Sequence, residues 1–404
     1  MQIWCLPIYW RIRRIVSIDG FAGAWLRCTR ESGQCSTKGA ETLKPHTLGH
    51  AQRGWLGSPS RVKGTHIFFF ILWKLKGDLE FWADDWGLPR WDAAQPCGVC
   101  PVTNRGDLPW TDMSHDAAWI PRIYTRESFN DMYPIPHLIF SAQPGMNSQS
   151  LSPDYMHDKH LGVDTYLLGS VIVMLCFYIM PDTAEDNMIT LWDYIHNVFY
   201  MSPEGRPHAA NAYSNLTLSM CCQASDPTAS APQLKGRAAE ICALTPGIHA
   251  AFDHFMDQND EHHRKIRLCL KYSKSLDQII HDHKEDDALP AAVALKFKKA
   301  VFNMLILYTD INKHAASLAR RLFNVTIKAH YLLHIGIGAA YLSPRLGWCY
   351  KGEDMMQKMK VLAASCVKSR SIYVVIFKMI EKYLYGLHHM YSGCGLTRSQ
   401  RTRR

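Results

Sequence analysis

The feature that most restricts the fold of this chain is an apolar run that is followed closely by an acid and a cysteine pair. The run spans residues 66–73 (HIFFFILW) and is typical of a buried strand. Gly77-Asp78 follows it, and Cys97-Gly-Val-Cys100 comes soon afterwards. A strand that delivers a carboxylate, with a pair of metal-type ligands beyond it, makes a metal-dependent enzyme acting on nucleic acid the first hypothesis to test.

Length and composition are compatible with this hypothesis, but they do not select it. The chain has 404 residues, of which 47% are hydrophobic, and such a length predicts one to three domains. The net charge of +9 fits a polyanionic partner, but it equally fits an ordinary basic protein. The 13 cysteines are an odd number and lack the dense spacing of a secreted disulfide scaffold. We therefore expect reduced thiols and an intracellular location.

Changes in composition along the chain predict five regions. They are an irregular N-terminal segment that could include a first core strand (1–62), a core part with the cysteine pair (63–150), a helical insertion with a loop near 202–234 (151–335), C-terminal core helices (336–390) and a basic tail (391–404). In the helical part, Val301, Leu305 and Tyr308 have the i, i+4, i+7 spacing of one helix face, and Pro290 is placed to begin that helix.

Two segments of the helical part have alternative interpretations. Residues 166–180 (YLLGSVIVMLCFYIM) are uncharged, but the run is shorter than the about 20 residues that a membrane span needs. A buried helix is therefore expected, and no membrane partner. Residues 257–287 are rich in charge and histidine, which could suggest a metal site; a solvated helix surface is the preferred interpretation.

Three acids are candidates for metal-ion catalysis. Carboxylates from separate elements can hold two Mg²⁺ or Mn²⁺ ions, which activate a water or hydroxyl and stabilise the leaving oxygen of a phosphodiester. Asp78 follows the apolar run, Asp19 ends a short strand-like segment, and Glu353 precedes a helical pattern. Each acid also has a structural alternative, a turn residue for Asp19 and Asp78 and a helix-capping acid for Glu353.

Four further residues are candidates for a structural zinc site. Cys97 and Cys100 have the spacing of half such a site, and His330 and His334 are one helical turn apart on one face. Together they would complete a Cys2His2 set. Spacing alone does not prove the pairing, because a single C-x2-C can occur by chance and the two histidines can simply pack in a core.

Five short motifs, in this order, resemble those of the transposases of CACTA-type DNA transposons, which belong to the DDE group. They are Ser17-Ile-Asp19-Gly20-Phe21, Lys76-Gly77-Asp78 with Cys97 and Cys100, Asp154-Tyr-Met156-His157 running through Leu161-Gly-Val163, Lys328-Ala-His330-Tyr-Leu-Leu-His334, and Trp348 to Glu353. The resemblance covers residues 66–180 and 320–366 best. It implies an α/β fold, with a ribonuclease-H-like core interrupted by a long, mainly helical insertion.

The resemblance also implies a function. Asp19, Asp78 and Glu353 would bind magnesium to cut and rejoin DNA in the nucleus or elsewhere in the cell, and zinc would pin the insertion to the core. A homo-oligomer is left open. The alternative is a catalytically inactive descendant that binds DNA or protein. It is favoured by the short, irregular N-terminal segment and by Lys351-Gly352 and Asp354 around Glu353, where this family more often has an aromatic residue and an arginine.

Overall fold

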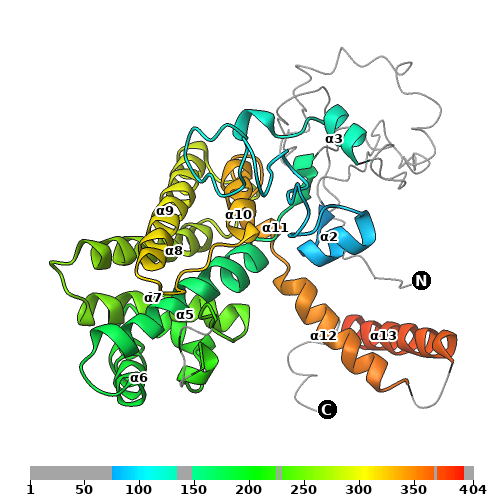
Figure 1. The fold of residues 1–404 in the computed structure, drawn as a ribbon. Helices are drawn as coiled ribbons and strands as arrows, with labels where there is room; N and C mark the ends of the chain where they lie inside the picture. Colours follow the sequence, from blue (N-terminus) through cyan, green and yellow to red (C-terminus); the bar gives the residue numbers. More distant parts are fainter. Residues whose placement is uncertain (1–74, 134–147, 224–226, 228–229, 368–370, 395–404) are drawn as a thin grey trace, which may run out of the picture. The chain divides into compact units, whose positions relative to one another are not determined.

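The computed structural model describes residues 75–133, 148–223, 227, 230–367 and 371–394. It divides the chain into two compact units, Met1–Trp348 and Cys349–Arg404. The described part of the first unit is mainly helical (Figure 1). The described part of the second unit contains two helices.

The elements follow one another along the chain, with labels as in Figure 1. They are β1 Leu75–Lys76, α2 Leu79–Trp86, η3 Ile120–Arg122, α3 Arg126–Met132, η4 Ser148–Ser150, β2 Leu151–Ser152, η5 Met156–Val163, α5 Asp164–Met174, η6 Leu175–Ile179, α6 Ala184–Asp193, η7 Tyr194–Phe199, η8 Arg206–Asn211, η9 Leu218–Met220, α7 Ala238–Phe255, α8 Glu261–Asp282, α9 Ala291–Ser317, α10 Ile327–Gly338, α11 Pro344–Gly347, α12 Tyr350–Ala364 and α13 Ile372–Cys394.

The expected α/β fold with a ribonuclease-H-like core is wrong for the described residues. Their only sheet is one parallel pair of two-residue strands, in which Leu75 pairs with Leu151 and Lys76 with Ser152. A parallel sheet needs several buried strands, each joined to the next by a crossover. The two segments that we expected to supply strands, the strand-like segment that Asp19 ends (residues 14–18) and the apolar run 66–73, lie outside the described residues. The core is instead built from helices.

Helices η5, α5, α7, α8, α9 and α10 pack around one another to form the main core of the first unit (Figure 1). Helix α9 begins directly after Pro290, as expected, and buries Val301, Leu305 and Tyr308 on the predicted face. Gly162 allows η5 to approach α10, because a Cβ atom at that position would lie 2.8 Å from Lys328 Cδ and 2.9 Å from the His157 carbonyl oxygen.

Continuous helical structure from Met156 to Ile179 passes through this core. By length and composition alone it could cross a membrane, with a mean hydropathy of 1.8 over its most apolar window. However, 78% of that window is buried inside the unit, as in a core helix. Polar groups lie on the same segment, including the buried Lys159 and Asp164. The expectation of a buried helix over residues 166–180 agrees with this burial.

In the second unit, the described residues form α12 and α13, which pack against each other. Lys382 on α13 donates from its Nζ to the hydroxyl of Ser365 at 2.9 Å. The helical spacing that begins near Glu353 correctly predicts α12, and Glu353 lies in its first turn.

Candidate metal centre

Two segments far apart in the sequence meet at a buried group of two cysteines and two histidines. Cys97 and Cys100 lie in the irregular segment between α2 and η3, where nearby prolines prevent regular structure. His330 and His334 lie one turn apart on α10. All four residues are buried, and their ligand atoms lie within 4.8 Å of one another. We call these four residues the Cys2His2 group.

The distances between the ligand atoms are close to those of a tetrahedral site. The Cys100 Sγ atom lies 3.2 Å from His330 Nε2 and 3.3 Å from His334 Nε2, and Cys97 Sγ lies 3.5 Å from His334 Nε2. The two Nε2 atoms are 3.1 Å apart. Zinc bonds of about 2.3 Å to sulfur and about 2.0 Å to nitrogen place tetrahedral ligand atoms roughly 3.3–3.8 Å apart. The donor set and its size therefore suit a metal such as zinc.

Hydrogen bonds hold the cysteine loop in place around these ligands. The hydroxyl of Tyr331, on α10, accepts from the Gly98 backbone N–H at 3.1 Å and lies 3.3 Å from the Pro96 carbonyl oxygen, to which it donates. The Val99 backbone N–H donates to Cys97 Sγ at 3.3 Å, which favours the thiolate form that binds metal. The loop is thus attached to α10 by contacts beyond the ligands themselves.

An indole ring forms one wall of the group. Trp119 is 1% exposed, and its ring centroid lies 4.6 Å from that of His330 and 5.0 Å from that of His334. Its Nε1–H donates to the backbone carbonyl of Asp112 at 2.9 Å, which fixes the orientation of the ring. Packing against a fixed indole limits rotation of both imidazoles, as a preorganised metal site requires.

The charges within the group favour metal binding. Burial opposes the thiolate of Cys97, but the hydrogen bond from Cys100 and the charges of His334 and His330 hold the pKa of Cys97 well below its usual range. Burial and the neighbouring Cys97 raise the pKa of Cys100 far above its usual range. Burial lowers the pKa of His330, although the neighbouring Cys97 opposes this, and so favours the neutral imidazole that binds metal. A thiolate beside a neutral imidazole is a pair of ready ligands, and a metal would displace the Cys100 proton.

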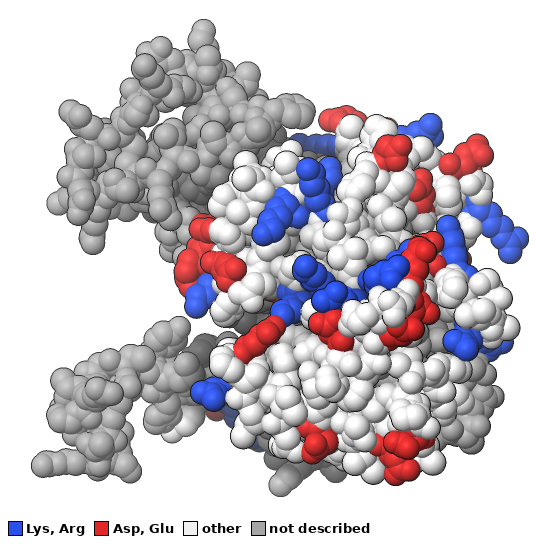
Figure 2. All heavy atoms as spheres, turned by 90° about the vertical axis from the view of Figure 1, so that its left-hand side faces the viewer, with Lys and Arg blue, Asp and Glu red and all other residues white. Residues whose placement is uncertain are grey.

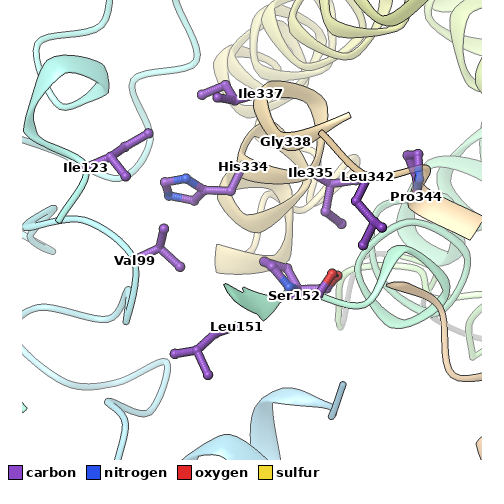
Figure 3. Close-up of a pocket in the computed structure, with 11 residues that line it drawn as sticks. Val99, Ile123, Leu151, Ser152, His334, Ile335, Ile337, Gly338, Leu342 and Pro344 are labelled. Carbon is purple, nitrogen blue, oxygen red and sulfur yellow. The ribbon is translucent and has the colours of Figure 1, made fainter. Parts of the chain in front are cut away.

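A small cavity borders the group (Figure 3). It has a volume of about 40 Å³, and His334 is the only imidazole in its lining. The other lining residues are mostly apolar: Val99, Ile123, Leu151, Ser152, Pro153, Ile335, Ile337, Gly338, Leu342 and Pro344. Pockets that hold small-molecule ligands are typically about 300–1,000 Å³, so this space is too small for an organic substrate.

Asp78 has a local structural role. Its carboxylate accepts a hydrogen bond from the Phe81 backbone N–H at 2.7 Å, which makes it the N-cap of α2. Gly87 ends the same helix in the left-handed conformation, with φ of 67°. Asp78 therefore has a local structural role, as its structural alternative expected, but it caps a helix and does not form a simple turn.

The expected three-acid magnesium site is not found among the described residues. Asp19 lies outside them, and the side chain of Glu353, which belongs to the second unit, is also not described. In the described part of the chain, only two sets of three or more ligand residues converge, the Cys2His2 group and a set of His160, Cys242 and Asp277. Neither is an all-carboxylate set of the kind that Mg²⁺ prefers.

The Asp154-Tyr-Met156-His157 motif begins the buried helical segment. The Asp154 carboxylate accepts from the Met156 backbone N–H at 2.9 Å, and its second oxygen lies 2.5 Å from His157 Nδ1. Asp154 therefore satisfies orphan groups at the start of η5, as an N-terminal cap does.

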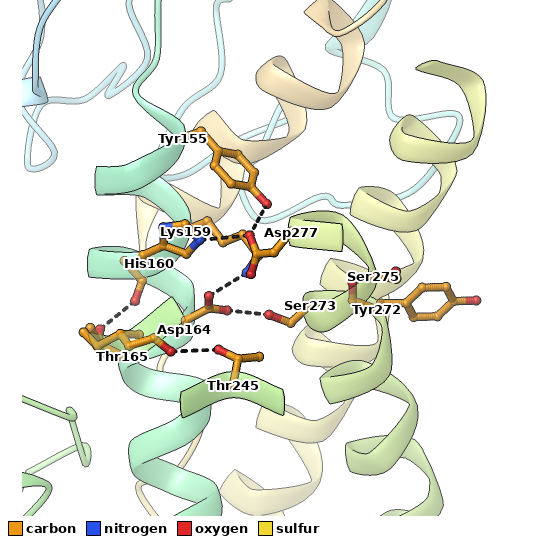
Figure 4. Close-up of polar contacts among 12 residues, drawn as sticks. Tyr155, Lys159, His160, Asp164, Thr165, Thr245, Tyr272, Ser273, Ser275 and Asp277 are labelled. Atoms are coloured by element: carbon orange, nitrogen blue, oxygen red, sulfur yellow. Dashed lines mark hydrogen bonds and ion pairs between the residues drawn. The ribbon is translucent and has the colours of Figure 1, made fainter. Parts of the chain in front are cut away.

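Sequence reasoning missed a buried ionic network that joins η5 and α5 to α8 (Figure 4). The Nζ atom of Lys159 lies 2.7 Å from Asp164 Oδ2 and 2.7 Å from Asp277 Oδ2. Asp164 also accepts from the Ser273 hydroxyl at 2.8 Å, and Asp277 from that of Tyr155 at 2.8 Å. The sequence offered one signal of this network. Lys159 and Asp164 directly precede the apolar run at 166–180, and charged residues that are buried with such a run must be paired.

Comparison with protein-family models, with curated proteins and with solved structures finds no match to this chain. The resemblance to CACTA-type transposases therefore depends on the short motifs alone. The candidate metal centre depends neither on these comparisons nor on the resemblance, since it follows from the geometry of four side chains.

Proposed function

We propose that the Cys2His2 group binds one structural zinc ion. The observation that carries this proposal is that four buried ligand atoms lie within 4.8 Å of one another. Four protein ligands fill a tetrahedral zinc completely, whereas catalytic zinc sites keep a position open for water or substrate. The ion would tie the loop of Cys97 and Cys100 to α10, and so supply folding free energy that this irregular loop cannot obtain from regular hydrogen bonding.

We further propose that the chain acts as a DNA-binding descendant of CACTA-type transposases that does not cleave DNA. The ordered motifs and the net charge of +9 support DNA as the partner. On the face drawn in Figure 2, lysine and arginine side chains are interspersed with aspartate and glutamate. Such a mixed surface fits moderate, salt-sensitive affinity better than strong non-specific binding.

Two observations favour binding over cleavage. The Asp78 carboxylate is engaged by the Phe81 backbone N–H at 2.7 Å and caps a helix. In addition, the described residues lack the multistranded sheet that would carry catalytic acids in a ribonuclease-H-like core. The roles of Asp19, Asp78 and Glu353 in Mg²⁺- or Mn²⁺-dependent cleavage stay a prediction, which the following experiment tests.

The test combines DNA binding with DNA cleavage on the full chain. Fluorescence anisotropy with a labelled duplex is measured over a salt series, and cleavage of supercoiled plasmid is followed with Mg²⁺ or Mn²⁺. The matched variants are Asp78→Asn, which keeps a good N-cap but removes a metal-binding carboxylate, and the double variant Cys97→Ser, Cys100→Ser.

The proposal expects binding that weakens as salt rises, no cleavage, and the same behaviour in Asp78→Asn. The double variant should bind poorly because it lacks the zinc. Metal-dependent cleavage by the wild type that is lost in Asp78→Asn would establish the enzyme instead. An absence of salt-dependent binding would remove DNA as the partner and leave the protein-binding alternative.

A further inference from the structure

Three residues from three helices meet at the edge of the ionic network. His160 lies on η5, Cys242 on α7 and Asp277 on α8, and their ligand-type atoms lie within 4.8 Å of one another. The His160 Nε2 atom is 2.9 Å from Asp277 Oδ1, and the Cys242 thiol is a hydrogen-bond partner of the same imidazole. Cysteine, histidine and aspartate, the three residue types of an activated thiol, thus lie close together.

The surroundings keep the imidazole protonated. Burial disfavours a charged His160, but the charges of Cys242 and Asp277, together with their hydrogen bonds, raise the pKa of His160 to about 10. Lys159 and Tyr155 also donate to Asp277, at 2.7 Å and 2.8 Å, so this carboxylate stays ionised. An imidazolium beside a thiol stabilises the thiolate, which is the reactive form of cysteine.

The same three residues are poorly suited to a second metal ion. The Lys159 ammonium lies 2.7 Å from Asp277 Oδ2 and would repel a cation bound to that carboxylate. A thiolate, by contrast, is an anion, and two neighbouring cations stabilise it. The exposure of the three residues also matters, since His160 is 1% exposed, whereas Cys242 is only partly buried. Of these two residues, Cys242 is therefore the one that a small reagent would reach more readily, and the dimedone test below measures this access.

We propose that Cys242 is a redox-reactive cysteine, activated by His160 and oriented through Asp277, which hydrogen peroxide oxidises to a sulfenic acid. The thiolate sulfur attacks one peroxide oxygen, and the new S–O bond forms as the O–O bond breaks. The departing hydroxide takes up a proton, for which the adjacent imidazolium is the donor, and becomes water. The sulfur loses two electrons and the peroxide gains them, so no other reactant is required.

The first test compares two cysteines of the same protein. Cys222 is also partly buried, and burial raises the pKa of its thiol, so it is the internal control for Cys242. The full chain is treated with a low concentration of hydrogen peroxide in the presence of dimedone, which traps sulfenic acids, and each peptide is quantified by mass spectrometry. Cys242 should be labelled at least about tenfold faster than Cys222.

A second measurement separates activation from simple exposure. Alkylation by iodoacetamide is followed from pH 6 to pH 9 in the wild type and in His160→Gln, which keeps a polar partner for Asp277 but removes the charge. The titratable groups that face the pair are Tyr155, Lys159, Asp164 and Asp277, from η5, α5 and α8. His160→Gln leaves all four of these groups unchanged.

Across this range, alkylation of Cys242 in the wild type should be at least about tenfold faster than that of Cys222, because His160 lies beside Cys242, whereas burial raises the pKa of the Cys222 thiol. In His160→Gln, the rate at Cys242 should fall to that of Cys222. If the variant does not fold, the wild-type rates are sufficient for the test. Equal rates at the two cysteines in the wild type would overturn the proposal.

Discussion

Cys100 Sγ lies 3.2 Å from His330 Nε2, although the two residues are 230 positions apart in the chain. A contact of this kind closes a very long loop, whose ordering entropy must be offset by the interactions that hold its ends together. The neighbouring contacts to Cys97 and His334 complete a site in which a single ion could hold both ends. The candidate metal centre thus joins the cysteine loop to the helical core, together with the contacts of Tyr331.

Replacing Tyr331 by phenylalanine should weaken the metal centre without removing a ligand. The hydroxyl accepts from the Gly98 N–H and contacts the Pro96 carbonyl, so its loss leaves a buried N–H unsatisfied. We expect a loss of about 1–3 kcal/mol in unfolding free energy and a roughly tenfold or greater loss in zinc affinity. Chelator competition and chemical denaturation measure the two effects. Zinc affinity equal to that of the wild type would show that the hydroxyl does not support the ligands.

Replacing Lys159 by methionine should be strongly destabilising. The side chain is fully buried between Asp164 and Asp277, and its removal leaves two carboxylates without their shared cation. Breaking a buried ion pair on one side typically costs about 3–5 kcal/mol. Lys265→Met is the matched control, because that lysine pairs with Asp310 at the surface and should change the denaturation midpoint little. Similar effects of the two substitutions would contradict the network.

Asp158 and Asp164 are both buried, but they should respond differently to replacement by asparagine. Burial raises the pKa of Asp158 well above its usual value, and neither of its carboxylate oxygens has a hydrogen-bond partner among the described residues. Folded Asp158 therefore keeps its proton at pH values where the unfolded chain has lost it. Consequently, its contribution to stability falls as the pH rises above about 4, by up to about 1.4 kcal/mol per pH unit.

Asp158→Asn should remove this pH dependence and leave the protein at least as stable as the wild type at pH 7. Asp164→Asn should instead destabilise, since Asp164 pairs with Lys159 and accepts from Ser273. Urea denaturation at pH 5 and pH 7 distinguishes the two. A marked loss of stability at pH 7 in Asp158→Asn would mean that its carboxyl has a partner in solution.

Patterns within a few residues predict local structure here. Contacts between residues that are far apart in the sequence are harder to predict. The i, i+4 spacing of His330 and His334 predicts a shared helix face, and the C-x2-C spacing predicts a ligand pair. No local pattern can join them, because the pairing depends on how α10 packs in three dimensions. Similarly, Lys159 and Asp277 are 118 positions apart, and neither residue alone indicates the network.

The incorrect α/β prediction has a related cause. It gave weight to short motifs whose residues also serve local structural roles. Asp78 follows an apolar run and caps α2, and Asp154 satisfies the first turn of η5, so both acids are explained by helix capping. Helical periodicity, which correctly predicts α9 and α12, was the more reliable guide to the fold of the described residues.

Metal content is the measurement that tests the central claim most directly. Purified wild-type protein and the double variant Cys97→Ser, Cys100→Ser are analysed by inductively coupled plasma mass spectrometry after extensive dialysis. Serine preserves the size of each side chain but is a poor zinc ligand. The account predicts about one zinc ion per wild-type chain and none in the variant. Zinc-free wild-type protein that also takes up no added zinc, or a variant that keeps its zinc, would contradict it.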